Sequence, residues 1–146
     1  MKYIVEIFNN RPFVVALIGW FVAQGFKILT TGIRYKKFDS ERIMGSGGMP
    51  SSHTASIVAA TVQLGKLSGF SDPVFGLGMV ISFITMYDAA NVRMAAGQQA
   101  KVIKQIVEQL GRSNFQIEKE LKELLGHTYL EVFVGMLLGI LIGLWY

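Results

Sequence analysis

The stretch GGMPSSHTAS, residues 47–56, joins flexible backbone, two adjacent hydroxyls and one of two histidines to a long apolar run. Pro50 suits the first turn of a helix, because its missing N–H costs little there. Ser51 and Ser52 would follow at the helix N-terminus, where backbone N–H groups and the helix dipole favour an anion. Gly48 lets the backbone approach a ligand closely. The stretch predicts a phosphate or oxyanion cradle with His53 as proton donor, although an ordinary Ser/Thr-capped loop fits it equally well.

Composition indicates a membrane protein with one domain over residues 1–146. Hydrophobic residues make up 51% of the chain and charged residues only 16%, and the mean hydropathy is +0.42. The absence of cysteine excludes a disulfide framework, thiolate chemistry and cysteine-ligated zinc or iron–sulfur sites. The net charge of +4 is modest, and because no basic run is interleaved with aromatics, we expect no nucleic-acid partner.

The apolar pattern predicts an all-α membrane bundle of about four transmembrane helices, near residues 11–31, 50–67, 74–96 and 128–146. A helix of about 20 residues spans a hydrocarbon core of about 30 Å. Residues 1–10 form a partly amphipathic lead-in without a signal-peptide cleavage site. One or two interfacial helices are expected between the third and fourth spans, within residues 97–126, because apolar residues recur there on one helical face.

The last span carries a small-residue stripe. Gly135, Gly139 and Gly143 repeat every four residues and so lie on one helical face. Such a stripe allows close helix contact, either within the bundle or between two chains. A homodimer through this stripe is therefore one expected partner arrangement.

Four spans bring four distant polar clusters to one membrane face. The first and third helices end on the face where the second and fourth begin. The clusters there are Lys27 with Arg34, Ser51 with Ser52 and His53, Asp88 with Arg93, and His127 with Glu131. Ionisable residues at or within spans are costly and usually functional. Basic residues are common at the ends of membrane helices, which would explain a single lysine or arginine here. That tendency does not explain why two histidines and two acids meet on one face.

Loop charges predict that this face lies in the cytoplasm, because basic residues are enriched in cytoplasmic loops. Apart from the candidate site residues, eight basic residues fall on the site side and three on the other. They are Lys36, Lys37, Arg42, Lys101, Lys104, Arg112, Lys119 and Lys122 against Lys2, Arg11 and Lys66. Both termini would then face outward.

His127 and Glu131 are four residues apart, so on a helix they share one face. The carboxylate then fixes the imidazole tautomer and leaves the other ring nitrogen free to attack or to take a proton. A pair that only stabilises the helix start is the alternative. Lys27, Arg34 and Arg93 are suited to neutralise a phosphoryl group. Asp88 would hold Arg93, bind a metal or form a simple ion pair at the membrane edge.

These motifs resemble those of the type 2 phosphatidic acid phosphatase and vanadium haloperoxidase superfamily. PSSH (50–53) is similar to its Pro-Ser-Gly-His motif, Lys27 and Arg34 match the spacing of its first motif, and His127 with Glu131 is similar to its third. The longer strings GGMPSSH (47–53), YDAA (87–90), VR (92–93), AGQQA (96–100) and LKELLGH (121–127) resemble its divergent, largely bacterial branch.

The resemblance implies a role for each residue. His127 would be the nucleophile that forms a phosphohistidine, Glu131 would orient it, and His53 would protonate the leaving alcohol. Lys27, Arg34, Ser51 and the Ser52 backbone would hold the phosphate.

Three positions depart from the superfamily pattern: Tyr35 replaces a proline, Ser52 replaces a glycine, and Leu121 stands where the third motif has arginine. We hypothesise that Arg93 supplies the missing positive charge. An Arg93→Ala protein with wild-type fold and unchanged turnover would refute this replacement. Lipid phosphatases of the superfamily tend to have six spans, so a chain with four leaves room for a dimer.

The sequence therefore predicts an integral-membrane phosphatase that hydrolyses a lipid phosphomonoester at the cytoplasmic leaflet of the bacterial plasma membrane, without a metal or other cofactor. A phosphatidylglycerophosphate-like lipid or a polyprenyl phosphate would suit an interfacial site. One alternative is a metal-assisted hydrolase or transferase that uses Asp88, Glu131 and the histidines as ligands. The other is a catalytically degenerate protein that serves in anion binding or assembly.

Overall fold

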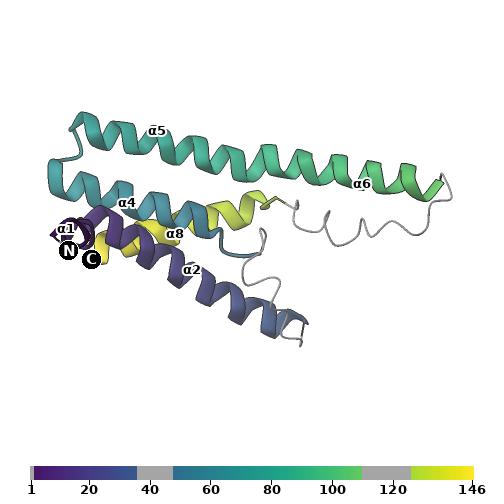
Figure 1. Ribbon diagram of the computed structural model, residues 1–146, viewed down its shortest axis with the longest axis horizontal. Helices are drawn as coiled ribbons and strands as arrows, with labels where there is room; N and C mark the ends of the chain where they lie inside the picture. Colours follow the sequence, from purple (N-terminus) through teal and green to yellow (C-terminus); the bar gives the residue numbers. More distant parts are fainter. Residues whose placement is uncertain (1, 36–47, 110–125) are drawn as a thin grey trace.

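A computed structural model of the chain describes residues 2–35, 48–109 and 126–146, and their side chains except at residues 31–35, 93, 104, 107 and 108 (Figure 1). All regular structure in these ranges is helical. The elements are α1 (Lys2–Asn9), α2 (Arg11–Tyr35), α4 (Ser52–Ser68), α5 (Pro73–Tyr87), the π-helical segment η1 (Asp88–Val92), α6 (Arg93–Gln109) and α8 (Tyr129–Trp145). The predicted helical membrane bundle is confirmed.

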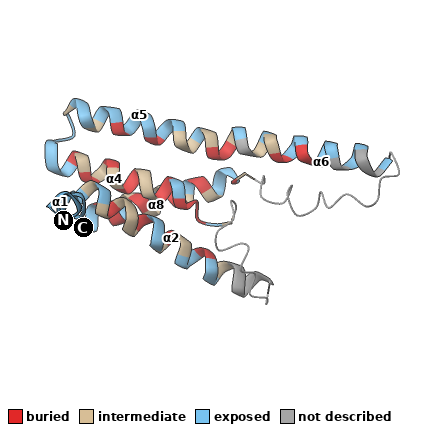
Figure 2. Cartoon of the chain, viewed as in Figure 1, coloured by how far each residue is buried: buried red, intermediate tan, exposed pale blue. Residues whose placement is uncertain are grey.

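Helix α4 is the centre of the bundle and packs against α2, α5 and α8. Figure 2 shows its many buried positions beside the largely exposed α5. Thr54, Thr61 and Gln63 are among the buried residues of α4, so the most polar span is the buried one, as its composition predicts. The membrane can solvate an apolar helix, whereas polar groups must find partners inside the protein.

The glycine stripe of α8 packs against α4. A Cβ added at Gly135 would lie 2.6 Å from the Ser51 carbonyl oxygen, and one at Gly139 would lie 2.7 Å from that of Ala55. Gly143 lies equally close to the next turn of α4, and all three glycines are buried. The stripe thus makes the contact within the bundle. A homodimer through the stripe, the other arrangement that the sequence allows, stays a prediction.

The contacts fix the direction of each helix. The N-cap residue 51 and residues 55 and 62 of α4 meet residues 135, 139 and 143 of α8 in that order, so these helices are parallel. Ser56 Oγ donates to the Ala16 carbonyl (2.9 Å), while Met49 contacts Thr30, so α2 runs antiparallel to α4. The end of α2 therefore meets the starts of α4 and α8, as the four-span topology predicts.

The third span is longer than expected. Helices α5 and α6 continue into one another through η1, from Pro73 to Gln109 (Figure 1). The expectation that the third helix ends near residue 96 is wrong, because the helix continues to Gln109 and includes the residues from Val102 onward that are expected to begin an interfacial helix. Gly97 is buried within the helix and does not break it. The second expected interfacial helix, near 117–125, lies outside the described residues.

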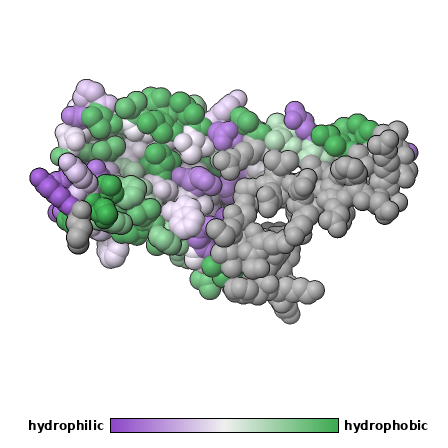
Figure 3. Space-filling view, in the orientation of Figure 1, coloured by the Kyte–Doolittle hydropathy of each residue, from purple (hydrophilic) through white to green (hydrophobic). Residues whose placement is uncertain are grey.

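Exposed apolar side chains cover α5, on which only Gly78 and Ser82 are buried. Figure 3 shows this apolar surface over the bundle. Two helical stretches of the described chain, Arg11–Thr30 and Pro73–Ile103, are long and apolar enough to cross a membrane, and Tyr129–Trp145 is a shorter apolar helix. An apolar surface of this size is suited to acyl chains rather than to water.

Candidate active site

Ser51 caps the start of α4. Its Oγ accepts hydrogen bonds from the backbone N–H of Thr54 (3.4 Å) and from the Thr54 hydroxyl (3.0 Å). Ser51 is therefore the N-cap and the first helical residue is Ser52, so Pro50 precedes the helix rather than lying in its first turn. Both serines are buried. The capped-loop interpretation of this stretch describes its local structure correctly, and it also positions a helix N-terminus inside the protein.

The start of α8 joins a histidine to a carboxylate. His127 is buried, and its Nδ1 lies 3.2 Å from Glu131 Oε2. The same oxygen accepts the Thr128 N–H (3.0 Å), and the Glu131 N–H donates to Thr128 Oγ1 (3.3 Å). This capping box turns the carboxylate back toward the chain before the helix. His127 thus meets Glu131 although it precedes the first helical residue, and Nδ1–H donation leaves the Nε2 lone pair available.

One backbone hydrogen bond connects these two helix starts. The Ser51 N–H donates to the Glu131 carbonyl at 3.0 Å, and Gly135 lies against the backbone of Ser51. The absence of a side chain at Gly135 is what permits this approach. The histidine–carboxylate pair is thereby fixed directly beside the N-cap of α4.

Lys27 brings a cation to the same place from α2. It is only 3% exposed, and its charge attracts the Glu131 carboxylate. Its aliphatic stem packs on Gly48, where an added Cβ would lie 3.2 Å from Lys27 Cγ. Gly48 has φ +93°, a conformation that favours glycine. The Thr30 hydroxyl lies 3.0 Å from the Met49 carbonyl and helps to hold this loop against α2.

The π-helical segment η1 supplies a fourth support. The His127 N–H donates to the Ala89 carbonyl (3.1 Å), and two residues further along each segment the Tyr129 hydroxyl donates to Asn91 Oδ1 (2.6 Å). The Asn91 amide is itself held by the Tyr87 carbonyl (3.2 Å). π-helical segments are frequent at functional sites. Sequence reasoning missed Asn91 and Tyr129; the signal for Asn91 is a polar amide inside an apolar span, and Tyr129 carries none.

The remaining predicted residues lie on the expected elements. His53 is exposed in the first turn of α4, and Asp88 is the first residue of η1. Arg34 and Arg93 lie in α2 and α6, but their side chains are outside the described part of the structure. Within the described ranges, no three His, Asp or Glu side chains are grouped as metal ligands.

The family model for the divergent PAP2 family matches residues 8–142. The chain belongs to this family. It is also similar to an uncharacterized membrane protein, YuiD, of Bacillus subtilis, with 35% identity over 151 residues that cover 96% of each chain. No solved structure matches it.

Membership of the divergent PAP2 family relates the chain to the PAP2 phosphatase superfamily and to membrane proteins. The matched region includes both histidines and every candidate site residue. In this family member the site combines a buried imidazole with an ordered carboxylate, a buried ammonium and a helix N-terminus. That set of groups can bind an anion and supply a nitrogen nucleophile.

Proposed function

We propose that the protein is an integral-membrane phosphatase that hydrolyses the phosphomonoester of a membrane lipid through a phosphohistidine at His127. The observation that carries the proposal is the pairing of buried His127 with Glu131 at the point where Lys27 and the N-terminus of α4 converge. The relation to the PAP2 superfamily supports the same chemistry. A phosphatidylglycerophosphate-like lipid or a polyprenyl phosphate suits a site at the end of a membrane bundle.

The first proposed step transfers the phosphoryl group to the protein. His127 Nε2 attacks phosphorus, the bond from phosphorus to the alkyl oxygen breaks, and His53 donates a proton to the leaving alcohol. Glu131 stabilises the charge that develops on the imidazole ring. Lys27, together with Ser51 and the Ser52 backbone, neutralises and holds the non-bridging oxygens, and this is electrostatic stabilisation of the transition state.

The second proposed step releases phosphate. His53, now neutral, takes a proton from water as the water oxygen attacks phosphorus and the P–N bond to His127 breaks. Arg34 and Arg93 are the further cations that we assign to the phosphoryl group, with Asp88 beside Arg93 and Gly48 supporting Lys27. The cycle ends with both histidines in their starting states, so no cofactor is consumed.

The proposed location is the cytoplasmic face of the bacterial plasma membrane, with the chain crossing it several times. The excess of basic residues in the loops on the site side supports this orientation. A lipid substrate would then enter from the inner leaflet, since the site lies where the spans begin and end.

Orthovanadate provides the test of this function, because it mimics the five-coordinate phosphoryl state. Purified protein in liposomes is given a panel of lipid phosphates, and inorganic phosphate release is measured with vanadate or a strong chelator added. We expect vanadate to block turnover and the chelator to leave it unchanged. We also expect a bell-shaped pH profile between about pH 5 and 8, because His127 must start neutral and His53 protonated.

Other outcomes would contradict the proposal in distinguishable ways. Loss of activity with the chelator would favour the metal-assisted alternative. A flat profile across this pH range would contradict the division of labour between the two histidines. Absence of turnover in wild-type protein, with phosphate analogues bound equally well by a His127→Ala variant, would favour the anion-binding alternative.

A further inference from the structure

Helix α1 carries an apolar surface that the rest of the described chain does not cover. None of its eight residues is buried, yet five of them are large and apolar. These are Tyr3, Ile4, Val5, Ile7 and Phe8, each between 52% and 78% exposed. A surface of this kind in water is unfavourable, so it requires a partner.

The residues of α1 form a polar face and an apolar face. Lys2, Glu6 and Asn9 are spaced four and three residues apart, so they form one polar stripe along the helix. The five apolar residues occupy the rest of the circumference. A short helix with a narrow polar stripe and a wide apolar face is the pattern of a helix that lies in a membrane surface.

The junction at Asn10 sets the direction of α1. The Asn10 N–H donates to the Ile7 carbonyl (3.2 Å), which ends α1. Asn10 Oδ1 then accepts the Phe13 N–H (3.1 Å) and caps α2. Figure 1 shows α1 nearly end-on, whereas α2, α4 and α8 run lengthwise across the picture. Helix α1 therefore lies across the long axis of the bundle.

The end of the bundle that carries α1 has the composition of a headgroup boundary. Trp145 and Tyr146 are exposed there, and Lys66 Nζ donates to the Leu144 carbonyl (2.9 Å). Figure 3 shows hydrophilic residues gathered at this end beside the apolar surface. Aromatic and basic side chains of this kind are enriched at membrane–water interfaces.

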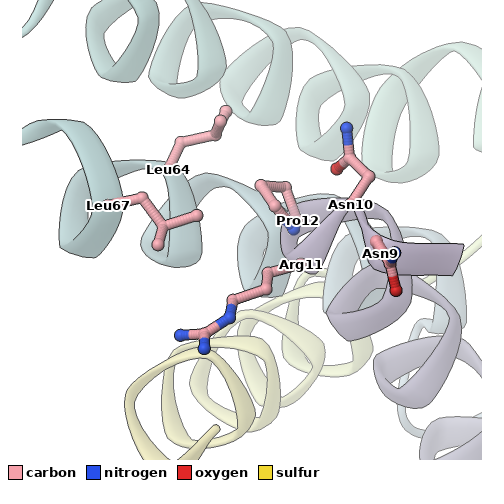
Figure 4. A pocket seen from close by; sticks show the side chains of 6 residues that line it. All are labelled: Asn9, Asn10, Arg11, Pro12, Leu64 and Leu67. Carbon is pink, nitrogen blue, oxygen red and sulfur yellow. The ribbon is translucent and has the colours of Figure 1, made fainter. Parts of the chain in front are cut away.

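An open pocket lies where the α1–α2 junction meets the end of α4. It is lined by Asn9, Asn10, Arg11, Pro12, Leu64 and Leu67 (Figure 4). The pocket combines a cation and two amides with an apolar wall. This combination matches the boundary between a lipid headgroup and its acyl chains.

We propose that α1 lies in the headgroup–acyl boundary of the leaflet opposite the candidate active site. Its apolar face enters the acyl region, and its polar stripe faces water. The argument for lipid as the partner is continuity: α1 ends two residues before the membrane span that begins at Arg11. Arg11 meets the lipid phosphates, and acyl atoms fill the pocket against Leu64 and Leu67. This proposal does not depend on the proposed enzymatic function.

The chain is well suited to a depth measurement because it contains no cysteine. Single variants Ile7→Cys on the apolar face and Glu6→Cys on the polar stripe are labelled with a nitroxide. The full-length protein is placed in phosphatidylcholine–phosphatidylglycerol liposomes, and collisions with oxygen and with a water-soluble nickel chelate are measured. Phe21→Cys, on the exposed face of α2, is the lipid reference, and Ser71→Cys, in the exposed turn before α5, is the water reference.

We expect the label at position 7 to collide mainly with oxygen, like the lipid reference, and the adjacent label at position 6 to collide mainly with nickel, like the water reference. A several-fold difference between these neighbouring positions supports the proposal. Equal nickel accessibility at both positions would place α1 in water and overturn it. Protection of position 7 from both reagents would also overturn it, because a protein surface would then cover the helix.

Discussion

Replacing His127 by asparagine is expected to reduce kcat on the order of 10⁴-fold or more for every phosphomonoester, as loss of a covalent nucleophile does in other enzymes. The asparagine amide keeps a donor near Glu131, which limits disturbance of this buried position. The loss therefore reports on the nucleophile rather than on the fold. The measurement is single-turnover phosphate release from the variant and wild-type proteins in the same liposomes.

The matched variant His53→Gln distinguishes the roles of the two histidines, because the need for a proton donor depends on the leaving group of the substrate. A general acid contributes about 10²–10⁴-fold when the leaving group is a poor one, such as an alkoxide. A nitrophenolate leaves without protonation, so this variant should lose much less activity on p-nitrophenyl phosphate than on a lipid phosphate. His127→Asn should lose activity on both. Equal losses on the two substrates for His53→Gln would contradict its assignment as the proton donor.

The second large effect, a loss of both stability and activity, is expected for Gly135→Ala at the close contact between α4 and α8. The new Cβ would lie 2.6 Å from the Ser51 carbonyl oxygen, which belongs to the backbone and cannot rotate away. We expect the two helices to separate and, as they do, to break the hydrogen bond from the Ser51 N–H to the Glu131 carbonyl. We expect a destabilisation of about 1–3 kcal/mol and a fall in kcat of more than about 10-fold, since misplacing catalytic groups by about 1 Å costs on the order of 10²-fold.

Gly76→Ala is the control, because it makes the same substitution in a helix where nothing lies within 4 Å of the added Cβ. Alanine favours helix over glycine by up to about 1 kcal/mol, so this variant should be neutral or slightly more stable. Thermal unfolding in detergent and phosphate release are measured for both variants. Similar destabilisation in the two would show that the contact with Ser51 does not govern stability.

Much of the helix arrangement and of the candidate site can be predicted from the sequence, because the order and number of the spans constrain which helix ends meet. Once the apolar segments are counted, an even number of spans between Lys27 and His127 places both on one face. The burial of α4 follows from its polar composition, since Thr61 must find partners and lies 3.1 Å from the Gly78 carbonyl and 2.9 Å from Ser82 Oγ.

Other features depend on tertiary contacts that no local pattern reveals. The third helix is expected to end near residue 96, yet Gly97 is helical and buried within α6. The glycine stripe predicts close packing but not its partner. The tie from Tyr129 to Asn91 joins residues 38 apart in the sequence, and only the π-helical turn at η1 brings them together.

In the proposed mechanism, segments from α2, α4, η1 and α8 converge to make His127 the phosphoryl acceptor. The most direct measurement is to quench the protein during turnover of a ³²P-labelled lipid phosphate and to map the label by alkaline peptide analysis and mass spectrometry. We expect an acid-labile, alkali-stable phosphate on His127 that is absent from the His127→Asn variant. Label on Ser51 or His53 instead, or rapid turnover with no phosphoprotein under any quench, would contradict it.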